Sequence, residues 1–209
     1  MPRISEERRA ANRAVIVDAA RRRFARDGFH QTSMPDIVAE AGISAGAFYR
    51  YFSSKEELVR EIAREAFGGL GGVVTALLAR NPAPSLPEVL GAVADTMGAP
   101  TFPAGGRLVD TDEQFRVAIQ AWGELVRDPG LQAEAHHGAE SFTAHVADAL
   151  ARGQAAGRVP AGLDPQDGAG LVFGLLPGLL LWRVVLGRDP GAAVRAVTAL
   201  ADPHTSPFG

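Results

Sequence analysis

The spacing of apolar residues along the chain predicts helices throughout. Apolar positions recur three or four residues apart, which is the period of a helix face that packs on a core. The predicted helices cover residues 7–26, 34–41, 45–52, 55–78, 86–97, 112–127, 129–156, 165–187 and 190–201. Residues 98–111 are rich in Pro and Gly and are predicted to form a loop. The pattern therefore favours an all-α fold.

The most specific pattern lies between Thr32 and Lys55, where two short helices are joined by a glycine turn. Ser33, followed three residues later by Asp36, forms a capping box that starts the first helix. Gly42 follows where a left-handed residue ends a helix without a Cβ penalty. Ser44 then caps the second helix.

The second helix has two different faces. Phe48 and Phe52 are four residues apart and share the face that packs inward. The opposite face is small at its start and polar further on, through Ala45, Gly46, Tyr49 and Arg50. This arrangement matches a helix-turn-helix whose second helix enters the major groove of DNA. The alternative is an ordinary helical hairpin.

The same residues resemble the DNA-binding signature of the TetR family of bacterial transcriptional regulators. The resemblance is carried by GIS at 42–44, GAFYRYF at 46–52 and SKEEL at 54–58, with apolar positions of the upstream helix in support. It implies phosphate contacts from Thr32 or Ser33, from Tyr49 and from Lys55. It also implies that Ser44, Ala45, Gly46 and Arg50 lie at or beside base edges. Ala45 departs from the longer polar residue that is common there, and it offers only a methyl contact.

Charge and domain order agree with this interpretation. The first 66 residues hold 12 Lys and Arg against 10 Asp and Glu, and the remainder hold 9 against 14. Basic residues are thus concentrated where DNA is expected. We divide the chain into an irregular basic arm at 1–12, a helix-turn-helix domain at 13–66 and a larger helical ligand-binding and dimerisation domain at 67–209. The arm either reaches a minor groove or is disordered, and disorder is favoured.

Two basic and glycine-rich stretches leave alternatives open. Arg21, Arg22 and Arg23 are predicted to point partly outward, either as a solvated face or towards phosphates. Four glycines at 68, 69, 71 and 72 interrupt the helix that starts at Lys55, and each costs about 1 kcal/mol relative to alanine. They indicate either close packing against a neighbour or a hinge or break between the two domains.

The C-terminal domain offers candidate pocket and interface residues. Aromatic side chains on its helices are candidates for a ligand pocket, although aromatics at helical spacing also serve as plain core. They are Phe102, Phe115, Trp122, Phe142 and Trp182. Gly170, Gly174 and Gly178 recur every fourth residue and form a small-residue stripe. We expect it to be a homodimer interface, with packing inside one chain as the alternative. The segment is judged too short and too interrupted to span a membrane.

Other chemistry finds little support in the sequence. His137 and His145 lie two helical turns, about 12 Å, apart, which is too far for them to share one metal ion easily. His136 and Glu140 form a closer pair but supply too few ligands. The chain has no cysteine and no catalytic or phosphate-binding motif. We therefore expect no enzyme, no metal and no cofactor, and the charged N-terminus predicts a cytoplasmic protein.

The sequence thus predicts a homodimeric transcriptional regulator that binds palindromic operator DNA. We expect a repressor that a small-molecule effector, hydrophobic in character, releases from its operator. The alternatives are an activator of the same fold, a helical ligand-binding or dimerisation protein that has lost DNA binding, and a small helical enzyme.

Overall fold

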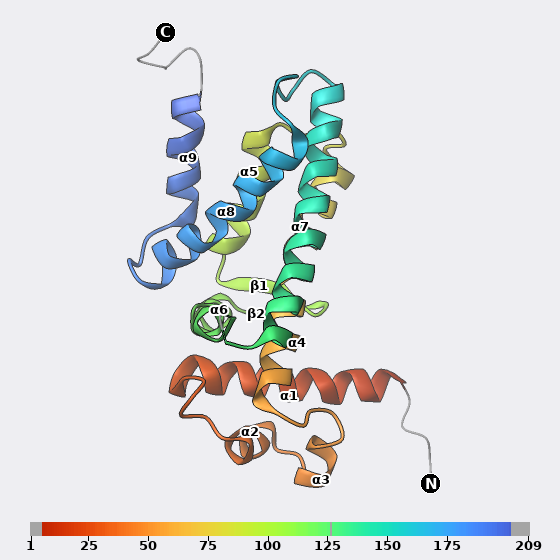
Figure 1. The fold of residues 1–209 in the computed structure, drawn as a ribbon, viewed down its shortest axis with the longest axis vertical. Coiled ribbons are helices and arrows are strands. Elements are labelled where there is room, and N and C mark those ends of the chain that lie inside the picture. Colours follow the sequence, from red (N-terminus) through yellow and green to blue (C-terminus); the bar gives the residue numbers. More distant parts are fainter. Residues whose placement is uncertain (1–5, 126, 202–209) are drawn as a thin grey trace.

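The computed structural model describes residues 6–125 and 127–201, which form nine helices and one short hairpin (Figure 1). The prediction of an all-α protein is confirmed apart from the hairpin. The elements in chain order are α1 (Glu6–Asp27), α2 (Met34–Ala41), α3 (Ala45–Phe48), α4 (Lys55–Arg80), α5 (Leu86–Gly98), β1 (Thr101–Ala104), β2 (Arg107–Asp110), α6 (Thr111–Leu125), α7 (Pro129–Ala155), α8 (Pro165–Val184) and α9 (Pro190–Ala201).

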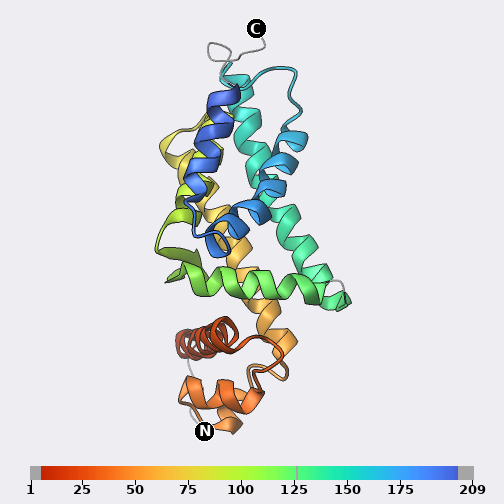
Figure 2. The ribbon, with the colours of Figure 1, turned by 90° about the vertical axis from the view of Figure 1, so that its left-hand side faces the viewer.

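Helices α1, α2 and α3 form one end of the molecule, and α4 leads from there into the larger helical part (Figure 1). α3 is shorter than predicted. It ends at Phe48, and the next residues tighten into turns in which the Tyr51 amide bonds the Phe48 carbonyl at 2.9 Å. Ser54 then caps α4 by accepting from the Glu57 amide. α6 lies crosswise between α1 and the upper helices (Figure 2).

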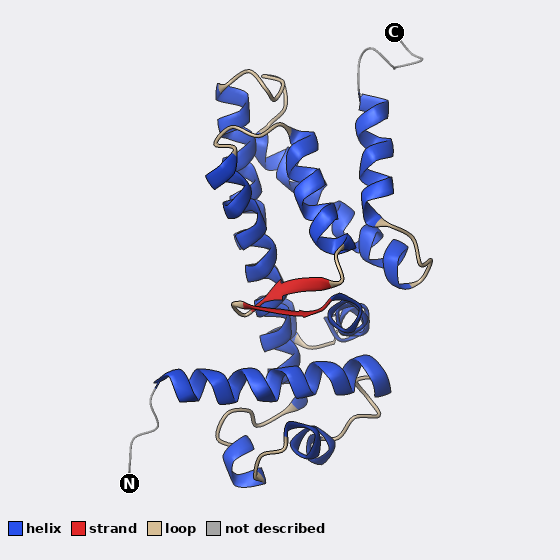
Figure 3. Ribbon diagram, turned by 180° about the vertical axis from the view of Figure 1, so that it is seen from behind, coloured by secondary structure: helices blue, strands red, loops and turns tan. Residues whose placement is uncertain are grey.

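The predicted loop at 98–111 instead contains the two antiparallel strands β1 and β2, which lie beside α4 and α6 (Figure 3). Gly105 and Gly106 connect the strands with φ angles of 57° and 75°, values that glycine adopts without steric cost. A Gly-Gly pair between short extended segments is a hairpin signal. The sequence interpretation missed it because the whole segment is rich in Pro and Gly, a composition that also indicates an irregular loop. Phe102 and Ala104 on β1 are buried.

α4 runs without a break through the four glycines, so the prediction of a helix break is wrong. The packing alternative holds at Gly69, where an added Cβ would lie 1.8 Å from the Pro103 carbonyl oxygen of β1. Gly68 and Gly72 have no neighbouring atom within 4 Å of an added Cβ among the described residues. The glycine face therefore accommodates the hairpin backbone at one position and is open at two others.

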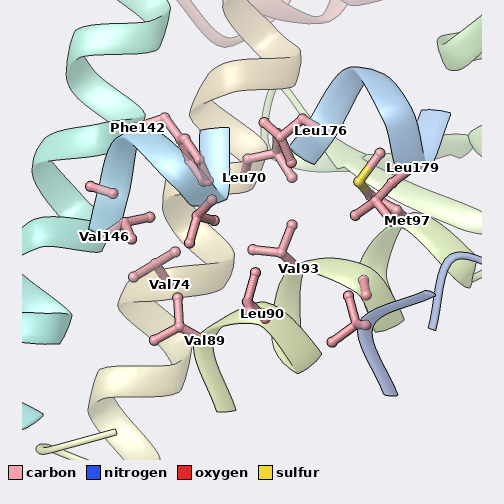
Figure 4. Packing of buried hydrophobic residues seen from close by; sticks show 14 of the residues in the cluster. Leu70, Val74, Val89, Leu90, Val93, Met97, Phe142, Val146, Leu176 and Leu179 are labelled. Carbon is pink, nitrogen blue, oxygen red and sulfur yellow. The ribbon is translucent and has the colours of Figure 1, made fainter. Parts of the chain in front are cut away.

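Two clusters of buried apolar residues lie along α4. The lower cluster joins α1, α2 and α3 to the first part of α4, and Val117 of α6 and Leu131 of α7 complete it. The upper cluster starts at Leu70 and gathers residues from α5, α7 and α8 (Figure 4). Because residues of α6 and α7 enter the lower cluster, the two ends of the molecule share packed side chains.

The N-terminal segment differs from the prediction in two respects. α1 begins at Glu6, so residues 6–12 are helical rather than irregular, and residues 1–5 lie outside the described residues. Arg21 does not point outward, because only 1% of its surface is exposed. Arg22 and Arg23 pair with Glu40 of α2 at 2.9 and 3.5 Å. The arginine run thus holds α1 to its neighbours.

Two helices, α4 and α8, are long and apolar enough to cross a membrane by length and composition. This corrects the argument that the segment at 165–187 is too short, since α8 has 20 residues. Each helix packs against α7 within the helical bundle. α8 also carries exposed apolar side chains, including Leu171 and Leu181. The high hydropathy of α8 therefore has two sources. One face is buried in the bundle, and another face is apolar but is not covered by other described residues.

Candidate DNA-binding surface and ligand cavity

The turn between α2 and α3 presents a small, exposed face. Gly42 ends α2 with φ 66°, and Ser44 caps α3 by accepting a hydrogen bond from the Ala47 amide at 3.3 Å. Ser44, Ala45 and Gly46 are all exposed at the start of α3. No described atom lies within 4 Å of a Cβ added at Gly46. The backbone at the start of α3 can therefore approach another surface closely, such as the floor of a DNA groove.

Some of the candidate DNA-contacting residues are exposed, and others are held by hydrogen bonds within the protein. Tyr49 is 47% exposed, and Arg50 and Ser33 are exposed as well. Thr32 is buried, and its hydroxyl donates to the Gly28 carbonyl at 2.7 Å, so Ser33 is the more accessible of the two phosphate candidates. Lys55 donates from Nζ to the Phe29 carbonyl at 2.9 Å and lies over the Phe29 ring.

An apolar cavity of about 150 Å³ lies where α4, α6, α7 and α8 meet. Three of the predicted pocket residues line it, namely Phe102, Phe115 and Trp122. Phe142 and Trp182 are not among its lining residues. Phe142 is fully buried in the upper cluster, and Trp182 stacks with Arg188. Phe142 thus has the plain packing role that helical spacing also predicts.

The cavity wall contains one polar side chain that the sequence interpretation missed. Gln114 of α6 lines the cavity and is 2% exposed. Its Oε1 accepts a hydrogen bond of 2.8 Å from Nε of the buried Arg21 of α1. A glutamine on an amphipathic helix has no distinguishing sequence signal, and its role depends on a partner 93 residues away.

The buried Arg21 belongs to a cluster of charged, partly buried side chains that joins three segments of the chain. It contacts Asp18 of α1 and Glu65 of α4, and Arg107 of the hairpin contacts the same two carboxylates at 2.7 and 2.9 Å. Burial raises the pKa of Asp18, but the hydrogen bond and charge of Arg107 and those of Arg21 outweigh it and hold the pKa below its ordinary value. The hairpin therefore connects electrostatically to the DNA-binding end.

The three glycines of the α8 stripe lie on an exposed face. Gly170, Gly174 and Gly178 are exposed, and a Cβ added at any of them would meet no described atom within 4 Å. The alternative that this stripe packs within one chain is therefore not seen in the described part. Val185, 64% exposed, and Leu186, 59% exposed, extend the apolar character of this region just beyond α8.

The histidine-rich part of α7 contains ion pairs rather than a ligand cluster. His136 lies 3.1 Å from Glu140 on an exposed surface, and His145 contacts the Ser141 carbonyl through Nδ1 at 2.6 Å. Among the described residues there is no group of three or more His, Asp or Glu side chains that could hold a metal ion. His136 and His145 thus each have a local partner on α7.

Comparison with known sequences gives matches of two kinds. The family model described as bacterial regulatory proteins, tetR family, matches residues 16–62. An uncharacterized HTH-type transcriptional regulator of Bacillus subtilis, YfiR, is 44% identical over 61 residues, which cover 29% of this chain and 30% of that protein. The HTH-type transcriptional repressor Rv1474c of Mycobacterium tuberculosis is 27% identical over 190 residues, covering 91% of each chain. Similarity is thus highest in the DNA-binding end and extends more weakly over almost the whole length.

Solved structures share the fold over the same length. A transcriptional regulator from Saccharomonospora viridis, described in complex with choline, has a TM-score of 0.69 at 20% identity and covers 91% of this chain and 95% of its own. This likeness concerns the arrangement of the helices in both the DNA-binding end and the larger part. The family match includes the turn between α2 and α3, which Gly42 and Ser44 shape, so residues 16–62 are similar to the DNA-binding end of bacterial regulatory proteins of the tetR family.

Proposed function

We propose that this protein is a transcriptional repressor that binds palindromic operator DNA as a homodimer and is released by a small apolar effector. The exposed turn and α3 face carry this proposal. Ser44, Ala45, Gly46 and Arg50 stand where base edges would be read, and Ser33, Tyr49 and Lys55 stand where phosphates would be held. Thr32 supports this surface from below through its bond to Gly28.

The effector site in this proposal is the cavity bounded by α4, α6, α7 and α8. α4 contributes Ile62 and Leu70 to the cavity wall, and at its other end it carries Lys55. An effector that binds one position of α4 better than another shifts the population of dimers away from the spacing of two successive major grooves, about 34 Å. Because α4 is one continuous helix, a change in its position at the cavity would also move its N-terminal end.

The proposed dimer uses the exposed apolar face of α8. Gly170, Gly174 and Gly178 would allow a second copy to approach closely, and recognition helices work in symmetric pairs. We place the boundary between the DNA-binding domain and the ligand-binding and dimerisation domain at residue 66, inside α4. Operator DNA as the partner implies a cytoplasmic protein.

DNA selection from a random duplex library tests the proposal. The purified chain should enrich a palindrome and bind it as a dimer, with affinity that falls as salt rises. Arg50→Ala should change the preferred sequence. Lys55→Ala should weaken binding to all sequences by about tenfold and should reduce the salt slope by about one. Arg80→Ala, at the far end of α4, serves as the matched control for loss of one positive charge.

The outcomes separate the alternatives. Folded protein that enriches no sequence at any salt concentration would refute DNA binding and favour a ligand-binding or dimerisation protein. An enriched palindrome placed upstream of a reporter gene distinguishes a repressor, which lowers expression, from an activator, which raises it. Lys55→Ala with unchanged affinity and salt slope would show that Lys55 serves only its bond to Phe29.

A further inference from the structure

The chemistry of the cavity wall defines the class of molecule that fits it. Among the described residues, no Asp, Glu, Lys, Arg or His side chain lines the cavity. A charged ligand would lose its hydration there without gaining an ion pair. An apolar cavity of about 150 Å³ is large enough to hold a benzene ring. These properties favour a small, uncharged and largely apolar ligand.

One polar side chain in the wall, Gln114, can orient a bound ligand. Gln114 uses Oε1 to accept from Arg21 Nε, and an arginine only donates, so the carboxamide orientation is fixed. The Nε2 amide is therefore turned away from Arg21 and retains two N–H donors. The hydrogen bonds of the described residues give Nε2 no acceptor, although Gln114 is 2% exposed. Nε2 is not among the fully enclosed side-chain atoms that lack a partner in the described part. Because Gln114 lines the cavity, a ligand or water there can supply the acceptor.

We propose that Gln114 is the specificity-determining contact of the cavity and that its Nε2 donates to the oxygen of an uncharged ligand of the aryl ketone or similar carbonyl class. This inference rests on the proposed function, in which the cavity is the effector site. Trp122 also lines the cavity, and its indole N–H is a donor only, so it adds no acceptor that could compete for Nε2.

Three probes with equal numbers of non-hydrogen atoms test this assignment. Acetophenone offers a carbonyl acceptor, isopropylbenzene replaces that oxygen with a methyl group, and benzoate carries a charge. Dissociation constants are measured by ligand-detected NMR on the full chain. The wild type should bind acetophenone about fivefold more tightly than isopropylbenzene, and benzoate more weakly than either. The infrared carbonyl frequency of bound acetophenone should be lower than in hexane.

Two variants distinguish the Nε2 donor of Gln114 from its Oε1, which accepts the hydrogen bond of Arg21. Gln114→Glu keeps an oxygen for Arg21 Nε but removes the Nε2 donor, so the preference for acetophenone should disappear. Gln114→Leu removes both groups and should also lose the preference while destabilising the fold. The infrared shift of the wild type provides a measurement that does not depend on either variant folding.

Several outcomes would overturn the assignment. They are equal binding of acetophenone and isopropylbenzene, an unshifted carbonyl frequency, a preference retained in Gln114→Glu, or binding of benzoate or choline in place of the ketone. Absence of binding by all the probes would overturn it as well. Binding of the wild type to its selected DNA, measured in parallel, reports on the proposed function separately, because it requires no occupied cavity.

Discussion

At the scale of single residues, the side chains that connect the two ends of the molecule are charged and are buried or half-buried. Arg107 contacts Asp18 of α1 and Glu65 of α4, and Arg21 contacts the same two carboxylates. Removing one member of such a cluster leaves an uncompensated charge in a poorly solvated place. The cluster therefore contributes most when all four groups are present and ionised.

Replacing Arg107 should destabilise the protein in a pH-dependent way. The lowered pKa of Asp18 means that its ionised form stabilises the folded state above the ordinary pKa, and that this contribution is lost as pH falls through the folded-state pKa. Arg107→Ala should cost about 2 kcal/mol at pH 7. Urea unfolding should show a smaller difference from wild type at pH 3 than at pH 7, because the contribution of ionised Asp18 is lost as the pH falls.

The control for this experiment is Arg152→Ala, which breaks an exposed pair with Asp148 on α7. That substitution should change stability little at either pH, because exposed pairs contribute little. A loss for Arg107→Ala that is the same at pH 7 and pH 3 would show that packing, rather than charge, holds the hairpin to α1 and α4.

At the scale of elements, α4 and the hairpin fit together through one glycine. Gly69 lets the Pro103 carbonyl of β1 approach the α4 backbone, while Gly68 and Gly72 face open space in the described part. The same residue type thus has two roles within five positions. Phe102 on the same strand lines the cavity, so the fit between α4 and β1 also sets part of the cavity wall.

Alanine substitutions should distinguish these glycines. Gly69→Ala should destabilise the protein by about 2 kcal/mol, because its Cβ would overlap the Pro103 carbonyl and the strand must move away. Gly68→Ala should stabilise it by up to about 1 kcal/mol through helix propensity alone. Midpoints of urea unfolding measure both changes. Equal effects at the two positions would contradict the close approach of β1.

At the scale of the whole molecule, the exposed face of α8 is the proposed contact between two copies of the chain. Gly174 is exposed in the middle of the stripe, with no described atom within 4 Å of an added Cβ. A lysine there would fit the single chain and favour the helix. In the proposed dimer, however, it would hold two helices apart and place two like charges opposite each other.

Gly174→Lys should therefore leave the fold intact and separate the dimer. Sedimentation velocity should show a dimer for wild type and a shift to monomer for the variant. Its affinity for the selected palindrome should fall by at least about tenfold, since only one half-site is then held. Ala133→Lys, on an exposed position of α7, adds the same charge elsewhere. A variant that remains dimeric would place the interface on another face.

Features that depend on neighbouring residues could be predicted from the sequence. The capping boxes at Ser33 and Ser85, the left-handed Gly42 and the bounds of most helices all follow from groups a few residues apart. The helix-turn-helix is predictable for the same reason, because its turn and caps form one continuous stretch. The hairpin was missed although its Gly-Gly turn is local, since glycine and proline also mark irregular loops.

The chain by itself thus determined the helices, their caps and the likeness of residues 16–62 to a known DNA-binding family. Only the tertiary structure decided that Arg21 is buried, that Gln114 lines a cavity and that a backbone carbonyl of β1 packs closely against Gly69. These features join residues tens of positions apart. Local hydrogen bonds and helical periodicity reach about one turn along the chain, whereas burial and ion pairing depend on which segments the fold brings together.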